Sequence, residues 1–390
     1  MKNWKLQENV FFTKDLKEIA NFITKNPKFT QGKLVKNFEK EFSLWNDSKY
    51  SIFVNSGSSA NLITLNAAKT IYNWKNNDEI IVPALTWPTT VTPIIQAGLK
   101  PVFLDCNFLD LSIDYDDLKK KITKNTKAIF LAHILGFPAN IDRIKKIIKK
   151  NKILIMEDCC ESPGAKYGET KIGNFGIAGT FSFYWGHHMT TIEGGMITTN
   201  NKKFYDMCKL KRSHGMAREL DPNDFSKIKK KYRKLDKNFL FLTDGFNLRS
   251  TEINAFIGIK QLKKLNNYIK IRNANYLYFL KIIKNYEKKG IWTISPTNLM
   301  TISSFAFPIF FKTSKYLIKF KKILYKNNIE FRTVISGNLL RQPFLKSFSN
   351  KSNKMPNADI VHKNGIYIGN NQFVNKRRLN WLASLFEKIK

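Results

Sequence analysis

The sequence predicts an α/β fold, in which helices cover a sheet. Between residues 50 and about 200, apolar runs of strand length alternate with amphipathic stretches of helical length, which is typical of this class. A chain of 390 residues with 43% hydrophobic and 13% aromatic residues can bury a large core, so a disordered tail, a collagen-like repeat and a coiled coil are excluded. The length favours two or three packed units over one.

Each element of the sheet region follows from a local pattern. Ser59–Thr70 predicts a helix after the first strand, and Thr251–Tyr268 predicts a long helix that leads out of the sheet. A fresh set of helices and strands begins near residue 270. We therefore expect a large domain over 1–265, with an N-terminal arm, and a smaller α+β domain over 266–390. The predicted strands of the large domain are Ser51–Val54, Glu79–Val82, Pro101–Leu104, Ala128–Ala132 and Ile153–Met156.

The net charge is strongly positive. Lys and Arg number 66 against 30 Asp and Glu, which gives +36. This charge attracts polyanions, and a phosphate-bearing small substrate would share in the attraction, but the lysines are scattered through every segment, as on a solvated basic surface. The charged stretch 225–238 is expected to be a surface loop or helix. Basic residues are not gathered on one element with aromatics or ligand motifs, so no nucleic-acid partner is expected.

The apolar runs and the cysteines bear on three further classes of protein. The apolar runs are far shorter than the ~20 residues needed to cross a bilayer, and the N-terminal residues lack a signal-peptide apolar region, so we expect a cytoplasmic protein without membrane contact. The four cysteines do not have the spacing of a zinc site, so neither metal nor structural disulfides are expected. We interpret the adjacent Cys159 and Cys160 as small core residues rather than a redox pair.

Four short segments lie where an α/β sheet builds a site, at strand ends and helix starts. In Val54–Leu62, the amides of Gly57 and Ser58 can face an anion at a helix N-terminus, although any serine-rich helix cap has this pattern. In Pro83–Thr90, Trp87 either stacks on a flat cofactor or packs in a loop. Each segment alone is a weak signal, and their combination is the stronger one.

The other two segments carry ionisable groups. Ile153–Ala165 contains a strand that ends at Asp158, whose carboxylate can keep a ring nitrogen protonated or can be satisfied by backbone groups. In Gly179–Asn200, His187 and His188 lie between a Ser-aromatic strand and a Glu-Gly-Gly turn. Two adjacent histidines without a third ligand make a poor metal site. An imidazole that titrates near neutrality is a natural general base.

Together with GFNLRSTEINAFIG (Gly245–Gly258), these segments resemble the DegT/StrS-type sugar-nucleotide aminotransferase family of fold-type I pyridoxal phosphate enzymes, over nearly the whole chain. The resemblance implies a large domain with a mixed, mostly parallel sheet. In that family a lysine that binds the cofactor covalently lies five residues after the phosphate-binding serine and seven before the Gly-Gly pair. Counting from Ser182 and back from Gly194 leads both times to His187, and no lysine lies within 174–200.

This departure resembles the 3-dehydratase branch of the family, in which histidine replaces the lysine and pyridoxamine phosphate is held without a covalent bond. Ser336–Pro343 and Asn357–Asn371 resemble the substrate-binding half of that branch, whereas Trp185 and Gly186 have no match in it. The resemblance implies that His188 is structural. It also implies the following roles: His187 as the base; Gly57, Ser58 and Ser182 on the cofactor phosphate; Trp87 on the ring; Asp158 on its nitrogen; Glu161 beside it; and Asn247 reaching the phosphate from the second subunit of an obligate homodimer.

The resemblance further implies a reaction. Pyridoxal or pyridoxamine phosphate would be the cofactor, and a nucleotide-diphosphate 4-keto-6-deoxyhexose, with GDP-4-keto-6-deoxymannose favoured, would lose its C3 hydroxyl. L-Glutamate would return the amine to the cofactor. A sugar aminotransferase with an unusual base, or a catalytically silent binding protein on the same fold, explains the same residues, and these alternatives stay open at this point.

Overall fold

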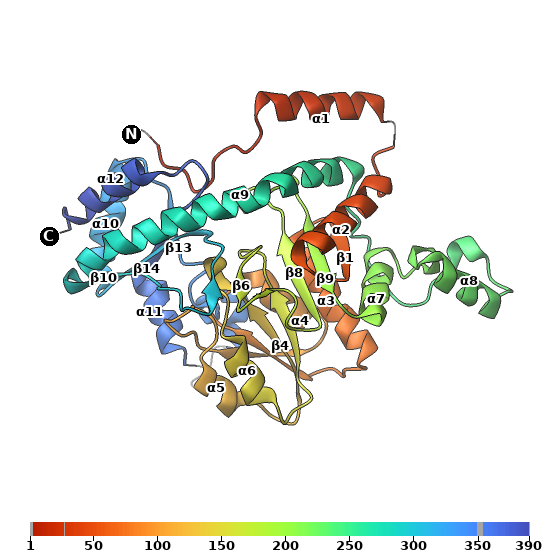
Figure 1. The fold of residues 1–390 in the computed structure, drawn as a ribbon. Coiled ribbons are helices and arrows are strands. Elements are labelled where there is room, and N and C mark those ends of the chain that lie inside the picture. The colour runs from red at the N-terminus through yellow and green to blue at the C-terminus, as the bar shows by residue number, and fades with distance from the viewer. Residues whose placement is uncertain (1–2, 27, 349–353, 390) are drawn as a thin grey trace.

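The computed structural model describes residues 3–26, 28–348 and 354–389. Its centre is a seven-stranded sheet in the order β1-β9-β8-β5-β4-β2-β3 (Figure 1). Strand β9 is antiparallel to both of its neighbours, and the other adjacent pairs are parallel, which confirms the predicted mixed, mostly parallel sheet. The strands are β1 (Tyr50–Val54), β2 (Glu79–Pro83), β3 (Lys100–Leu104), β4 (Thr126–Ala132), β5 (Leu154–Asp158), β8 (Ala178–Ser182) and β9 (Gly195–Thr199).

Helices cover both faces of this sheet because its strands are apolar on both faces. Ile80 and Val82 join the core under one layer of helices, and Ile81, between them, joins the core under the other. One layer consists of α3 (Gly57–Ile71), α4 (Pro88–Gln96) and α7 (Lys202–Arg212). The opposite layer consists of α2 (Lys33–Asn46), α5 (Tyr115–Lys121), α6 (Ile141–Ile148) and the first part of α9 (Glu252–Ile283).

Side-chain caps set where many of these helices begin. The Ser56 hydroxyl accepts a hydrogen bond from the Ser59 amide and so starts α3 directly after the first strand. Pro88 occupies the first turn of α4, where its missing N–H costs nothing. Asp114, Asn140, Asn201 and Thr251 cap α5, α6, α7 and α9 in the same way as Ser56.

The second half of the chain builds a smaller antiparallel sheet in the order β10-β12-β14-β13. Helix α9 runs from the large sheet to this second unit (Figure 1) and is longer than predicted, because it continues past Tyr268 to Ile283. The predicted domain boundary at 265/266 falls inside α9 and stays a proposal. This unit consists of β10 (Ile291–Trp292), β12 (Ala306–Phe311), α10 (Ser314–Lys326), β13 (Phe331–Thr333), α11 (Pro356–Asn364), β14 (Gly365–Gly369) and α12 (Lys376–Phe386).

The remaining elements are peripheral. Helix α1 (Thr13–Lys25) lies along α9, where Phe22 stacks on Phe256 with ring centroids 4.5 Å apart. Helix α8 (Pro222–Lys231) lies in the predicted charged surface segment, has no buried residue and projects from the molecule (Figure 1). Three short strands, β6 (Lys166–Tyr167), β7 (Thr170–Lys171) and β11 (Met300–Thr301), form a separate small sheet. Short 3-10 helices are η1 (Ile134–Gly136), η2 (Ala217–Glu219), η3 (Lys237–Phe239), η4 (Lys284–Lys289), η5 (Leu339–Arg341) and η6 (Pro343–Phe348).

None of the helices in the described part of the chain has both the length and the apolar character needed to cross a membrane.

Candidate active site

A cavity of about 670 Å³ lies at the carboxyl ends of the parallel strands, where α/β sheets place their sites. Its walls come from the starts of α3 and α4, the ends of β4, β5 and β8, strands β12, β13 and β14 of the four-stranded sheet, and the N-terminal arm. Seven of the eight predicted site residues line it: Gly57, Ser58, Trp87, Asp158, Glu161, Ser182 and His187. The fold therefore brings together residues that are up to 130 positions apart in the sequence.

The start of α3 forms a close-fitting cradle. Gly57 and Ser58 are the first two residues of the helix, so their amides have no partner within it and can bind an anion. A Cβ added at Gly57 would lie only 2.5 Å from the Cβ of Ser182, so glycine alone lets the helix approach β8 this closely. The Ser58 hydroxyl contacts the Thr89 hydroxyl at 3.1 Å, which links this cradle to α4.

Asp158 ends β5 with a carboxylate that is held in one orientation. One of its oxygens accepts hydrogen bonds from the Asn61 amide and the Thr90 hydroxyl, each at 2.8 Å. The other oxygen accepts the Cys160 amide at 3.1 Å. Asn61 is held in turn by the Thr180 hydroxyl, which donates to its carbonyl oxygen at 2.6 Å. These three donors fix the direction of the carboxylate, which can then pair with a partner nitrogen.

Glu161 has the opposite electrostatic character. Burial raises its pKa to about 8, the Leu135 amide that donates to its Oε2 at 2.9 Å opposes the rise, and the nearby Asp158 carboxylate adds to it. At neutral pH the Glu161 side chain therefore carries a proton and presents an O–H donor near Asp158. Two carboxyl groups in one pocket thus offer one acceptor and one donor.

His187 lies in the loop after β8 with its ring 5.5 Å from that of Phe305. Its Nδ1 is buried and has no hydrogen-bond partner among the described residues. Burial lowers the pKa of this imidazole to about 4, and the Cys160 carbonyl and Asp158 only partly oppose the effect. The ring is therefore neutral at physiological pH, with a lone pair ready to accept a proton.

His188 is buried behind this position and is not among the residues that line the cavity. Its Nε2 contacts the Ser303 carbonyl at 3.0 Å and the Ser303 hydroxyl at 3.2 Å. These bonds join the loop between β8 and β9, which carries both histidines (the histidine loop), to the segment before β12. This is the role of a structural residue.

Trp87 and Asn247 complete the predicted set. Trp87 lines the cavity just before α4 and is 53% exposed, so its side chain is accessible to a ligand. Asn247 is exposed, lies outside the cavity and accepts a hydrogen bond from Arg249 at 3.1 Å. Within a single chain the fold does not bring Asn247 to the other seven residues.

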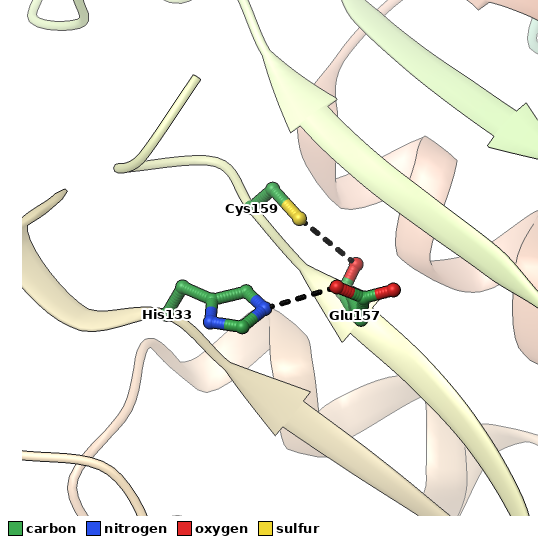
Figure 2. A group of neighbouring side chains, drawn as sticks. All are labelled: His133, Glu157 and Cys159. Carbon is green, nitrogen blue, oxygen red and sulfur yellow. Dashed lines mark hydrogen bonds and ion pairs between the residues drawn. The ribbon is translucent and has the colours of Figure 1, made fainter. Parts of the chain in front are cut away.

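A buried cluster beneath the site resembles a metal centre in composition but is satisfied by protein groups (Figure 2). The Ala139 amide donates to His133 Nδ1 at 3.1 Å, so the proton lies on Nε2 and is donated to Glu157 at 3.1 Å. The Glu157 carboxylate also accepts the amides of Gly173, Phe175 and Gly176 at 2.8 to 2.9 Å. The Cys159 thiol contacts the Glu157 carbonyl at 3.8 Å. The cluster therefore fixes the end of β5 that carries Asp158.

The cysteines are free. Cys159 is fully buried, and burial raises the pKa of both its thiol and the neighbouring Cys160 thiol well above the ordinary value. Both side chains therefore remain thiols. Cys159 packs in the core as the sequence suggested, whereas Cys160 is only partly buried and lines the cavity.

Residues 12–378 match the DegT/DnrJ/EryC1/StrS aminotransferase family. This chain belongs to that family. Within it, the chain is 34% identical over 394 residues to the GDP-4-keto-6-deoxy-D-mannose 3-dehydratase of Yersinia pseudotuberculosis, covering 100% of this chain and 99% of that protein.

Solved structures from the family have the same fold. The E. coli GDP-4-keto-6-deoxy-D-mannose-3-dehydratase with bound hydrated PLP superimposes with a TM-score of 0.92 at 35% identity, covering 99% of this chain and 100% of that one. A GDP-4-keto-6-deoxymannose-3-dehydratase with a trapped PLP-glutamate geminal diamine gives a TM-score of 0.88 at 33% identity, covering 100% of both chains. The fold-type I aminotransferase fold expected from the sequence is thereby confirmed.

Sequence reasoning missed several residues that line this cavity or lie directly behind it. Asn61 and Thr90, which hold Asp158, lie inside segments that were singled out, but nothing in the sequence distinguished them from their neighbours. Lys5 and Gln7 enter from the N-terminal arm, and Arg332 enters from β13. The sequence carries no local signal for these last three residues, because only the tertiary fold brings them to the site.

Proposed function

We propose that this protein is a pyridoxamine/pyridoxal phosphate-dependent sugar-nucleotide 3-dehydratase. It removes the C3 hydroxyl of a nucleotide-linked 4-keto-6-deoxyhexose, with GDP-4-keto-6-deoxymannose favoured and L-glutamate as amino donor. One observation carries the proposal: a neutral His187, with a free buried Nδ1, occupies the position beside Asp158 where the family's aminotransferases have lysine. Histidine can move a proton but cannot capture the cofactor covalently.

The described residues fit this cofactor. A Cβ at Gly57 would fill the cradle at the start of α3, whose free amides suit a phosphate, and the fixed Asp158 carboxylate suits a protonated ring nitrogen. The orphaned His187 Nδ1 lacks a partner that a ligand would supply. In this proposal Gly57, Ser58 and Ser182 hold the phosphate, Trp87 stacks on the ring, Asp158 pairs with its nitrogen, Glu161 donates its proton beside the ring, and Asn247 reaches the phosphate of a second copy.

The proposed chemistry divides between cofactor and protein. When bound, pyridoxamine phosphate supplies an amine that condenses with a ketone and a ring that accepts and returns electrons. In this proposal His187 Nδ1 removes the proton whose loss drives departure of the C3 hydroxyl, and the proton that it gains is available to the departing oxygen, which leaves as water. Asp158 keeps its partner nitrogen protonated throughout. Glu161 is neutral at physiological pH, so it adds no second negative charge beside Asp158.

A homodimer belongs to the same proposal. Asn247 is exposed and outside the cavity of its own chain, so a role on the cofactor phosphate requires a second copy. Size-exclusion chromatography with light scattering tests this part separately: we expect twice the mass of the 45.4 kDa chain.

The experiment that tests the function is an incubation with GDP-4-keto-6-deoxymannose, L-glutamate and pyridoxal phosphate, with the product read by mass spectrometry. We expect a sugar that has lost one oxygen atom and contains no new nitrogen, together with released ammonia. A 4-amino sugar as the main product would instead establish an aminotransferase. If a protein that binds the cofactor formed neither of these products, that result would contradict both enzyme hypotheses.

A further inference from the structure

The N-terminal arm is fixed beside the cavity before α1 begins. Trp4 is fully buried, and its indole N–H donates to the Gly369 carbonyl at 2.9 Å. Its backbone bonds to Asn328 and Glu330 at 2.9 and 2.8 Å, and the Leu6 amide donates to the Glu330 carboxylate at 2.9 Å. These contacts therefore fix the position of the next residue, Gln7, at the cavity.

Gln7 bridges two groups that matter for His187. Its Nε2 donates to the His187 carbonyl at 3.3 Å, and its Oε1 accepts from Arg272 Nη2 at 3.2 Å. Since Gln7 also lines the cavity, it is the direct link between the arm, α9 and the histidine loop.

Arg272 is an unusual partner because it is a buried cation without a carboxylate. Its side chain is 1% exposed, and its Nη1 donates to the carbonyls of Phe305 and Asn370. In the part of the chain that the structure describes, its hydrogen bonds all go to uncharged oxygens, and its Nε has no partner. Burial lowers its pKa to about 9, so the guanidinium stays charged at neutral pH.

The groups that act on His187 come from three sides. From the end of β5 and the loop after it, the Cys160 carbonyl and the Asp158 carboxylate favour the protonated imidazole, whereas Glu161 is neutral there. The neighbouring His188, in the same loop, is uncharged, because burial and then Arg272 lower its pKa well below the ordinary value. From α9, Arg272 disfavours a second positive charge.

We propose that Gln7 is a positioning residue: it ties the backbone of His187 to the buried Arg272 guanidinium, and so holds the imidazole in place and within the influence of that cation. The catalytic consequence rests on the proposed function, in which His187 is the base. The structural part does not, because the bridge exists in the protein without substrate and can be tested there.

The test changes the charge of Gln7 and keeps its size. In Gln7→Glu a carboxylate faces Arg272 close to His187, so the midpoint of the His187 titration should rise by about one pH unit or more, as expected for an opposite charge within ~6 Å. Gln7→Met removes both hydrogen bonds without adding charge. Gln96→Glu, at the exposed end of α4, is the matched control for the added carboxylate.

The first readout is NMR titration of the histidine rings in the substrate-free protein, with the His187 signal assigned by its loss in His187→Asn. A raised midpoint in Gln7→Glu, with the Gln96→Glu midpoint equal to the parent's, supports the proposal. An unchanged midpoint in folded Gln7→Glu overturns it. This readout is independent of the reaction, so it separates failure of this proposal from failure of the proposed function.

The second readout is the pH profile of dehydration. The acid limb of kcat should shift upward in Gln7→Glu by the same amount as the titration midpoint. In Gln7→Met, kcat should fall about tenfold or more through misplacement of the base, with KM and the unfolding midpoint close to the parent's. If Gln7→Glu does not fold, Gln7→Met still decides, because an unchanged kcat in that variant overturns the positioning role.

Discussion

Glu161→Gln should make the folded protein more stable at neutral pH, although it removes an ionisable group from the site. The pKa of Glu161 is about 8 in the fold against an ordinary value of 4.5, because the side chain is buried. Below pH 4.5 both the folded and the unfolded chain carry this proton. Between pH 4.5 and pH 8 only the folded chain keeps it, so the free energy of unfolding falls by about 1.4 kcal/mol per pH unit.

The size of the effect follows from that window. Over the roughly 2.5 units between pH 4.5 and pH 7 the loss reaches about 3 kcal/mol, and above pH 8 it levels off because the folded chain ionises too. Glutamine has the shape of the protonated acid, and its carbonyl oxygen can still accept the Leu135 amide. The variant therefore avoids the loss, and its advantage over the parent should be absent near pH 4.5, about 3 kcal/mol at pH 7 and constant above pH 8.

Urea unfolding of the cofactor-free protein at half-unit steps from pH 5 to pH 9 measures this difference directly. Glu169→Gln, at an exposed position, is the matched control, and we expect its stability to follow the parent's at every pH. If Glu161→Gln also followed the parent at every pH, Glu161 would ionise normally in the fold. Its assignment as the neutral donor of the site would then be wrong.

Four further substitutions test the site. His187→Asn should keep cofactor binding but lower dehydration by a factor on the order of 10²–10⁴, and His187→Lys should give a yellow protein that retains cofactor after borohydride treatment and dialysis. Asp158→Asn should lower turnover far more than stability, with unfolding changed by about 1–3 kcal/mol, because Asn61 and Thr90 lose a charged acceptor. Gly57→Ala should weaken cofactor affinity in an absorbance titration, because the new Cβ would meet Ser182 at 2.5 Å.

Each of these predictions has a result that would contradict it. Loss of dehydration in His188→Asn with full activity in His187→Asn would move the base to the neighbouring residue. Retention of cofactor by the parent after borohydride treatment and dialysis would contradict non-covalent binding. Unchanged turnover in Asp158→Asn would remove that carboxylate from the reaction, and parental affinity in Gly57→Ala would show that the cradle tolerates a side chain.

The parts of the fold that were predictable are those that local sequence determines. Strands buried on both faces appear as short apolar runs, and the cap at Ser56 gives the start of α3. The end of α9 was not predictable in this way. Beyond the predicted end at Tyr268, the side chains of Asn273 and Asn275 donate to the carbonyls of Ile302 and Val374, so tertiary contacts hold this part of the helix.

The same division holds for the site. Asp158, His187 and Gly57 lie next to strand ends and turns, where spacing is informative, and the structure places all three at the cavity. Gln7 and Arg272 act through partners 180 and 265 positions away, and no local pattern encodes such pairings. The altered pKa of Glu161 likewise depends on burial, which exists only once the chain has folded.

The hydrogen bond between Trp4 and Gly369 also has a consequence for synthesis. These residues are 365 positions apart, so at a translation rate of about 5–20 residues per second Trp4 leaves the ribosome roughly 20 to 70 s before its acceptor exists. The last strand of the large sheet ends at residue 199, so this sheet can form during the interval. The Trp4 indole is not yet hydrogen-bonded to Gly369 at that stage. The cavity wall that contains Gln7 is therefore among the last parts of the molecule to assemble.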